Sequence, residues 1–165
     1  MTTSPLHVRL ARPGEAAAAA GLWLSFMREH NTRHGKLVRA TQRNRRAMEV
    51  HLARLTEVGQ LWVLEAPEGL VGFAAVVPNL AEVDLFEASA ALTDLYVEPA
   101  WRGQGWGRAL LNAVTHDVAS RGLDALTLRV AVGNPARAMY LAAGFEVRTE
   151  TLVLTLTEQA GPAGN

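Results

Sequence analysis

Apolar positions three or four residues apart predict four helices in this chain. The first follows Pro13, and the second is capped by Thr41 and stopped by Gly59. The third follows a cluster of glycines and closes near Gly122, and a short fourth helix runs over residues 135–143. Proline in a first turn, threonine at an N-cap and glycine after a last turn are the usual boundary signals of helices.

Alternating apolar and polar positions predict the strands. They lie at residues 7–10, 61–64, 70–77, 91–97, 125–130 and 151–157. A turn over residues 66–69 joins the second and third strands into an antiparallel hairpin, which Pro78 and Asn79 end. A polar connection then runs to Glu87. This order of elements predicts a mixed α/β or α+β fold.

Composition narrows the class of protein. The 165 residues suit one domain, and a hydrophobic fraction of 49% excludes wholesale disorder. The chain has no cysteine, which excludes disulfides, Cys-ligated zinc, iron–sulfur clusters and a cysteine nucleophile. An apolar stretch with an alanine run ends at Arg28, too short to cross a bilayer and without the basic start of an export signal. We therefore expect a cytoplasmic protein without a membrane partner, and a disordered tail at 158–165.

The zero net charge conceals two charged blocks. Sixteen Lys and Arg residues balance 16 Asp and Glu residues, which argues against binding nucleic acid through bulk charge. Residues 28–54 carry a net charge of +6, whereas residues 55–100 contain no Lys or Arg and carry −8. The blocks are interpreted as solvated faces that partly pair with each other, or as a field around a charged ligand. A nucleic-acid module on the Arg-rich 41–54 helix is disfavoured because no partner recognition helix accompanies it.

The segment that is most informative about ligand binding joins the strand ending at Val97 to the third helix. Glycines stand at the alternate positions 103, 105 and 107, and Arg102 and Arg108 flank them. Glycines allow the backbone to approach a ligand, and the free N–H groups of a first helical turn attract an anion such as a diphosphate. The spacing fits neither a Rossmann fingerprint nor a Walker loop. A glycine-rich turn without a ligand is the alternative.

Two motifs in this part of the chain resemble the GNAT superfamily of N-acetyltransferases. The first is Arg102-x-x-Gly105-x-Gly107 after Leu95-Tyr96-Val97, which is similar to the acetyl-coenzyme A signature. The second runs from Asn134 to Tyr140 and continues with Ala143-Gly144-Phe145. The resemblance implies one GNAT domain over residues 6–157, with a central, mostly antiparallel twisted sheet of about six or seven strands and about four flanking helices.

The resemblance also implies an acetyl-CoA site. The strand Leu95–Val97, including Tyr96, would diverge from its neighbour and pair its main chain with the pantetheine arm. Cofactor contacts are further expected from Arg102 and Gly103, and main-chain N–H groups for the pyrophosphate from Gln104, Gly105, Trp106, Gly107 and Arg108. Trp106 stands where a smaller aliphatic residue is more usual in the family. Asn134 would hold the pantetheine or cap the following helix.

The candidate catalytic residues are Tyr140 and Asp94. Tyr140 matches the family's tyrosine that protonates the departing coenzyme A thiolate, and a phenol is protonated at neutral pH; a packed aromatic residue is the alternative. For the general base, Asp94, Glu98 or a water relay remain open, because Thr93 stands where the polyamine-acetylating branch is often acidic. Alternation places Asp94 and Tyr96 on one face of the strand. The five histidines have no metal-ligand spacing, so no metal is expected.

The function implied is acetyl transfer from acetyl-CoA to a primary amine of a small molecule or peptide. Without a cysteine, the amine is expected to attack directly in a ternary complex. The alternative is a non-catalytic acyl-CoA-binding regulatory domain of the same fold. The +6 block favours an anionic acceptor and the acidic strands equally allow a cationic one. Homodimers are common in the family.

Overall fold

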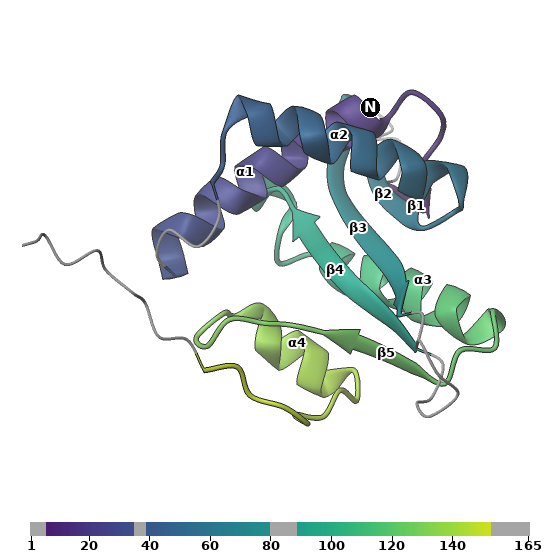
Figure 1. Cartoon of the computed structure of the whole chain (residues 1–165), viewed down its shortest axis with the longest axis vertical. Coiled ribbons are helices and arrows are strands. Elements are labelled where there is room, and N and C mark those ends of the chain that lie inside the picture. The colour runs from purple at the N-terminus through teal and green to yellow at the C-terminus, as the bar shows by residue number, and fades with distance from the viewer. Residues whose placement is uncertain (1–5, 35–38, 80–88, 153–165) are drawn as a thin grey trace, which may run out of the picture. The chain divides into compact units, whose positions relative to one another are not determined.

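The computed structural model describes residues 6–34, 39–79 and 89–152 (Figure 1). The chain divides into two compact units, Met1–Val132 and Gly133–Asn165, and each is described by itself. The predicted connection over 80–87, the end of the last predicted strand and the predicted tail lie outside the described residues.

The first unit is built on a sheet of five strands. They are β1 (His7–Leu10), β2 (Leu61–Ala66), β3 (Gly69–Asn79), β4 (Ser89–Val97) and β5 (Ala125–Leu128), in the spatial order β1-β2-β3-β4-β5. The first three pairings are antiparallel, and β4 and β5 are parallel. This confirms the mixed α/β class and the mostly antiparallel sheet. The described residues hold five strands, fewer than the six or seven expected, and Thr151 and Leu152 at the start of the last predicted strand are not in one.

Three helices belong to this unit: α1 (Ala16–His34), α2 (Gln42–Glu57) and α3 (Trp106–Ser120). A short 3₁₀ helix, η1 (Pro99–Trp101), follows β4. The hydroxyl of Thr41 accepts a hydrogen bond from the N–H of Asn44 at 3.2 Å, which confirms the predicted N-cap of α2. No helix within the described ranges is long and apolar enough to cross a bilayer.

Four predicted strand bounds were wrong by two residues: β2 ends at Ala66 and not at Leu64, β4 begins at Ser89 and not at Ala91, and the ends of β3 and β5 also differ. β3 does not stop before Pro78 but continues to Asn79, pairing Pro78 with Ala90 of β4. Proline is tolerated there because the other neighbour, β2, begins with Leu61 opposite Ala75 and does not reach Pro78, so the missing N–H removes no bond from that side. β5 in turn ends at Leu128 and not at Val130.

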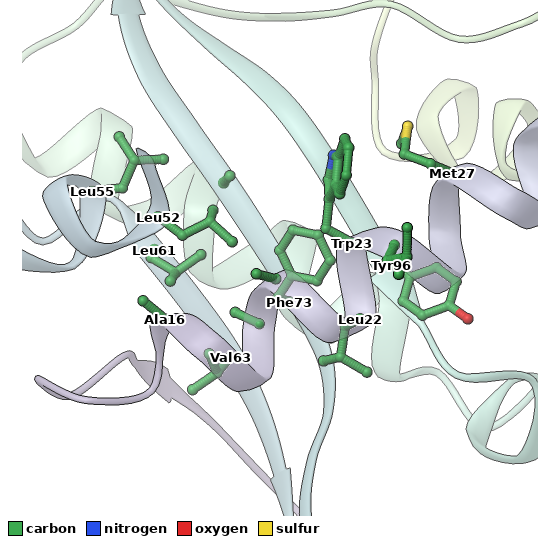
Figure 2. Close-up of a cluster of buried hydrophobic side chains, with 14 residues drawn as sticks. Ala16, Leu22, Trp23, Met27, Leu52, Leu55, Leu61, Val63, Phe73 and Tyr96 are labelled. Atoms are coloured by element: carbon green, nitrogen blue, oxygen red, sulfur yellow. The ribbon is translucent and has the colours of Figure 1, made fainter. Parts of the chain in front are cut away.

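A hydrophobic cluster lies between one face of the sheet and the helices α1 and α2 (Figure 2). Phe73 of β3 and Leu61 and Val63 of β2 are fully buried there beneath Leu52 of α2 and Trp23 of α1. The apolar stripe of α3 is buried as well and packs on the sheet with Leu110, Leu111, Val114 and Val118. Burial of this apolar surface is the main stabilising contribution of the unit.

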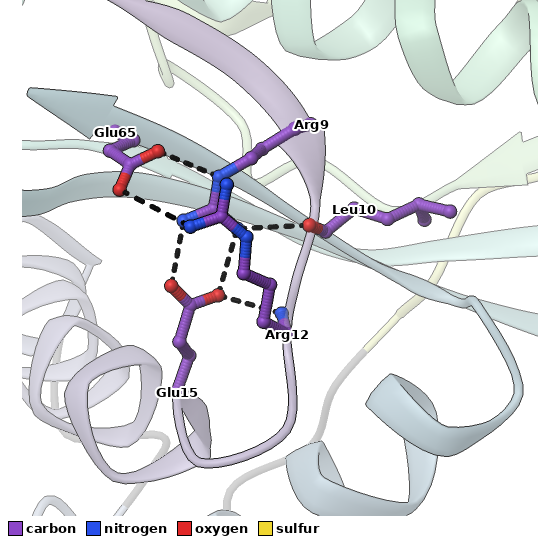
Figure 3. Close-up of polar contacts among 5 residues, drawn as sticks. All are labelled: Arg9, Leu10, Arg12, Glu15 and Glu65. Atoms are coloured by element: carbon purple, nitrogen blue, oxygen red, sulfur yellow. Dashed lines mark hydrogen bonds and ion pairs between the residues drawn. The ribbon is translucent and has the colours of Figure 1, made fainter.

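A charged network ties β1 to its neighbours (Figure 3). The guanidinium of Arg9 donates to Glu65 of β2 at 2.7 Å and to both carboxylate oxygens of Glu15, just before α1, at 2.9 and 2.7 Å. Glu15 also accepts the N–H of Arg12 at 2.7 Å. The hydrogen bonds from Arg9, ahead of that from Arg12, lower the pKa of Glu15 to about 2. The network therefore fixes the point where the chain passes from the sheet into α1.

The second unit is described over residues 133–152. It contains one helix, α4 (Ala136–Ala142), which confirms the predicted short helix to within one residue at each end. The N–H of Phe145 donates to the carbonyl of Tyr140 at 3.1 Å after Gly144, whose φ is +95°. This is the helix end that the Ala-Gly-Phe sequence predicts.

Candidate functional site

The sheet opens between β4 and β5. β4 is paired with β3 along its whole length, up to Val97 opposite Gly72. Its pairing with β5 covers only four residues, from Ser89 to Leu92, which is opposite Leu128. Beyond Leu92 the main chain of residues 93–97 has no ladder partner in β5, and the two ribbons diverge in Figure 1. The expected divergence of the strand Leu95–Val97 is therefore present.

A β-bulge marks the point of divergence. Asp94 is opposite Ala75 and Leu92 is opposite Val76, so Thr93 is an extra residue in β4. Its hydroxyl donates to the carbonyl of Ala75 at 3.3 Å. A bulge bends a strand and increases its twist. The position of Thr93, directly after the last residue paired with β5, explains why β4 leaves its neighbour there.

β4 leads through η1 into a glycine loop at the start of α3. Gly103 and Gly105 have φ values of +76° and +88°, a region that L side chains rarely adopt. Gly105 is the N-cap of α3 and provides no side-chain acceptor, and the N–H of Ala109 makes the first intrahelical bond to it. The N–H groups of the first turn thus have no partner inside the helix. A Cβ atom built at Gly103 or Gly105 would meet no atom within 4 Å, so the space over the loop is open.

Arg102, predicted to contact the cofactor, makes several contacts within the protein. Its Nε donates to the carbonyl of Val97 at 2.7 Å, and its two terminal nitrogens each lie 2.7 Å from a carboxylate oxygen of Glu29 in α1. The guanidinium also lies 5.3 Å from the ring centre of Tyr96. Of the other predicted loop contacts, the side chains of Gln104 and Arg108 are exposed.

Trp106 begins α3 with a half-buried ring. Its indole Nε1 is buried and has no hydrogen-bond partner in the described part of the chain. The main-chain N–H of this residue belongs to the first turn of α3, together with those of Gly107 and Arg108. The backbone contribution predicted for Trp106 therefore does not depend on where its ring lies.

Asp94 and Tyr96 share one face of β4, as the alternation predicts, and this face lies toward α1 and α2. The ring of Tyr96 is buried and stacks on Phe26 of α1 with ring centres 5.4 Å apart. Asp94 is half-buried, and this burial raises the pKa of its carboxyl; the hydroxyl of Thr93 and the charge of His51 in α2 act in the opposite direction. A carboxylate whose pKa is raised by its surroundings binds a proton more readily near neutral pH.

In the second unit, Asn134 and Tyr140 are held by α4. The side-chain oxygen of Asn134 accepts the N–H of Ala136 at 2.9 Å, so this side chain caps the first turn of the helix. Tyr140 is buried and meets Phe145 edge-on, with ring centres 5.9 Å apart. Burial raises the pKa of the Tyr140 phenol, which keeps it protonated at neutral pH.

The arginines of the basic block lie mostly on the surface. Arg39, Arg43 and Arg46 are exposed, whereas Arg45 donates to the carbonyl of Ala17 at 3.1 Å. Ion pairs inside the block join Glu29 to Arg33 and Arg45 to Glu49. In the acidic block, Glu65 pairs with Arg9, outside the basic block. Within the described ranges, no group of three or more His, Asp or Glu residues could hold a metal ion.

Comparison with known families shows to which family the chain belongs. Residues 57–147, more than half of the chain, match the family model of the acetyltransferase (GNAT) domain. The chain belongs to the GNAT acetyltransferase family. The match includes β4, the glycine loop, α3 and α4. Among curated proteins no sequence matches this chain.

Solved structures show the GNAT fold over nearly the whole chain. A mutant of the BH1408 protein from Bacillus halodurans is 19% identical, with 92% of this chain and 99% of that chain covered and a TM-score of 0.77. A GCN5-related N-acetyltransferase from Ralstonia eutropha JMP134 is 19% identical, with coverages of 92% and 99% and a TM-score of 0.67. An aminoglycoside N-acetyltransferase, AAC(6')-Iy, solved in complex with CoA, is 16% identical, with coverages of 96% and 98% and a TM-score of 0.70.

Two residues near the end of β4 and the start of the glycine loop were not predicted from the sequence. Glu29 is 73 positions away from Arg102, and no motif includes it. Gly72 lies opposite Val97, where a Cβ atom would approach the carbonyl oxygen of Tyr96 to 2.8 Å. A glycine inside the predicted hairpin strand was the one available signal, since such a glycine often marks a close backbone approach.

Proposed function

We propose that this protein transfers the acetyl group of acetyl-CoA to a primary amine of a small molecule or peptide. One observation carries the proposal: in a chain of the GNAT acetyltransferase family, β4 loses its β5 partner after Leu92 and leads into an open glycine loop at the start of α3. The first feature offers main-chain groups to an extended ligand and the second offers N–H groups to an anion. Acetyl-CoA has both kinds of group: its pantetheine arm is extended and carries amides, and its diphosphate is an anion.

The residues present fit this cosubstrate. The main chain of Leu95, Tyr96 and Val97 would pair with the pantetheine arm. The N–H groups of the 104–108 segment would bind the diphosphate, since they are unpartnered within α3 and the space above Gly103 and Gly105 is open. We assign Asn134 a further pantetheine contact through its amide nitrogen, because its side-chain oxygen already caps α4.

Asp94 is the proposed general base. An amine must be neutral to attack a thioester, and a carboxylate with a raised pKa accepts a proton well near neutral pH. Asp94 has that raised pKa and lies on the same side of the sheet as α1 and α2. Its carboxylate would take the proton that the amine nitrogen loses as the new C–N bond forms.

Tyr140 is the proposed general acid. As the C–S bond breaks, the departing sulfur carries a negative charge, and the phenol O–H of Tyr140 would give it a proton. Burial keeps this phenol protonated before the reaction, and the phenolate regains its proton from solvent afterwards. Because the chain has no cysteine, no cysteinyl thioester forms on the protein, and transfer is direct in a ternary complex.

We assign residues 6–157 to one acetyltransferase domain. The family match runs from residue 57 to residue 147 and so crosses the boundary between the two compact units after Val132. Tyr140 and Asn134 belong to the second unit, while the glycine loop belongs to the first.

The test is acetyl-CoA turnover, followed as release of free thiol, with a panel of amines. The panel includes an aminoglycoside, a polyamine, a carboxylate-bearing amine and a peptide N-terminus, which together cover both signs of acceptor charge. Turnover with at least one amine is expected, and Tyr140→Phe is expected to lower kcat by about 10²-fold with unchanged CoA affinity. Tight CoA binding without turnover on any amine would instead favour the non-catalytic acyl-CoA-binding domain.

A further inference from the structure

The side chain of Arg102 joins three elements that carry or border the cofactor site. All three side-chain nitrogens donate hydrogen bonds. Nε donates to the carbonyl of Val97, the last residue of β4, and the two terminal nitrogens donate to the carboxylate of Glu29. The face of its guanidinium lies near the ring of Tyr96. Arg102 is also the C-cap of η1. The glycine loop therefore begins at a residue that is fixed by contacts with β4, α1 and η1.

The contact with Glu29 is the strongest of these. Two parallel N–H···O bonds of 2.7 Å between a guanidinium and a carboxylate form the bidentate geometry that fixes both groups in one plane. The hydrogen bonds from Arg102 are the main cause that lowers the pKa of Glu29, ahead of the opposing effect of burial. The side chains of Arg102 and Glu29 are 35% and 24% exposed, so water and salt weaken the pair without removing it.

This geometry gives Arg102 a structural contribution besides the cofactor contact that its sequence motif predicts. A guanidinium with three nitrogens bonded inside the protein is held toward α1 and the end of β4. Without Glu29, Nε and the Tyr96 ring would be its remaining contacts, and the side chain would regain rotational freedom. The loop that starts at Arg102 would then lose one of its fixed ends.

We infer that Glu29 is a positioning residue of the cofactor site, which holds Arg102 against the Val97 carbonyl and so sets the direction in which the Gly103–Gly105 loop enters α3. This inference rests on the proposed function, because the ligand concerned is CoA. Glu29 acts through Arg102 and touches no part of the cosubstrate. Its contribution is to CoA affinity and not to the chemical step.

The experiment measures the dissociation constant of CoA by titration calorimetry for the full chain and for Glu29→Gln. Glutamine keeps the size of the side chain but has one acceptor oxygen and no charge, so the bidentate pair is lost. CoA is expected to bind about 5- to 20-fold more weakly, and the KM for acetyl-CoA to rise by a similar factor, with kcat changed less than about twofold. Glu49→Gln is the matched control, since Glu49 is the partner of an i,i+4 pair with Arg45 on α2, and its CoA affinity is expected to equal that of the parent.

A double-mutant cycle tests whether Glu29 acts through Arg102. If it does, adding Glu29→Gln to Arg102→Gln weakens CoA binding no further than Arg102→Gln alone. Independent, multiplying effects would overturn the inference. A Glu29→Gln protein that binds CoA as tightly as the parent would also overturn it, even if the melting temperature of that protein were lower. If the parent itself binds no CoA, both the inference and the proposed function fail; if the parent binds and the variant is unchanged, only the inference fails.

Discussion

Leu92 of β4 is paired with Leu128 of β5, and it is the last residue of β4 that has a partner in β5. The bulge at Thr93 follows at once and turns β4 away, while pairing with β3 continues to Val97. One extra residue in one strand therefore leaves residues 93–97 in a strand that is paired with β3 and, within the described part of the chain, with no strand on the other side. That stretch ends five residues before Arg102, where the glycine loop begins, so only Glu98 and η1 separate the open strand from the open loop.

Gly105→Ala is expected to weaken CoA binding. The φ of Gly105 is +88°, and an L residue in this region costs about 1–2 kcal/mol, which the loop relieves by changing its conformation. The first-turn N–H groups then lose their common direction. Calorimetry with CoA should show about tenfold weaker binding, with circular dichroism confirming an intact fold.

Gly14→Ala is the control for this change. Gly14 has a φ of +92°, and a Cβ atom there would meet nothing within 4 Å, so alanine meets a similar backbone strain and no clash. It lies in the turn before α1 and not in the glycine loop. Its CoA affinity should equal that of the parent. Equal loss of affinity in both variants would contradict a specific contribution of the loop.

Gly72→Ala is expected to disturb the end of β4. The new Cβ would lie 2.8 Å from the Tyr96 carbonyl oxygen and 3.2 Å from the Cβ of Leu64, and backbone cannot move away cheaply. Overpacking of this kind costs about 1–3 kcal/mol of folding stability. The KM for acetyl-CoA should rise together with the loss of stability in a denaturant titration. A variant that loses stability yet keeps its KM would show that the end of β4 does not hold the cosubstrate.

Glu15→Gln tests the network around Arg9. The folded-state pKa of Glu15, about 2, lies below its ordinary value of 4.5, so the ionised carboxylate stabilises the fold at pH above 4.5. This contribution is lost as the pH falls from 4.5 through about 2. At pH 7 the substitution should lower the free energy of unfolding by about 1–3 kcal/mol, and at pH 2 most of that difference should vanish. A difference that is constant with pH would contradict the ionic origin of the effect.

Asp94→Asn tests the proposed base through the pH dependence of the reaction. The base acts when deprotonated, so kcat/KM should fall as the pH drops through the raised pKa of Asp94. The asparagine variant should lose about 10²-fold in kcat and lack this acidic limb. Because the acceptor amine also ionises, the pH profile is measured with two amines of different pKa. A limb caused by the amine moves with the pKa of the amine, whereas a limb caused by Asp94 does not. An acidic limb that persists in the variant would assign the base to Glu98 or to a water relay.

Local signals in the sequence predicted most of the helices and strands. Thr41 and Gly59 mark the ends of α2, and the alternation in residues 7–10 marks β1, because caps and side-chain periodicity depend on neighbouring residues only. The end of β3 could not be predicted in this way, since whether Pro78 removes a ladder bond depends on where β2 begins in the fold. The pairing of Glu29 with Arg102 could not be predicted for a similar reason, because only the packing of α1 beside β4 brings the two side chains together.

The central claim is that the open side of β4 and the glycine loop hold acetyl-CoA. A crystal structure of the protein with CoA tests it most directly. We predict that the pantetheine amides bond to the main chain of residues 95–97 and that the diphosphate lies on the N–H groups of residues 104–108. CoA bound at another surface, or a diphosphate that makes no bond to these N–H groups, would contradict the account.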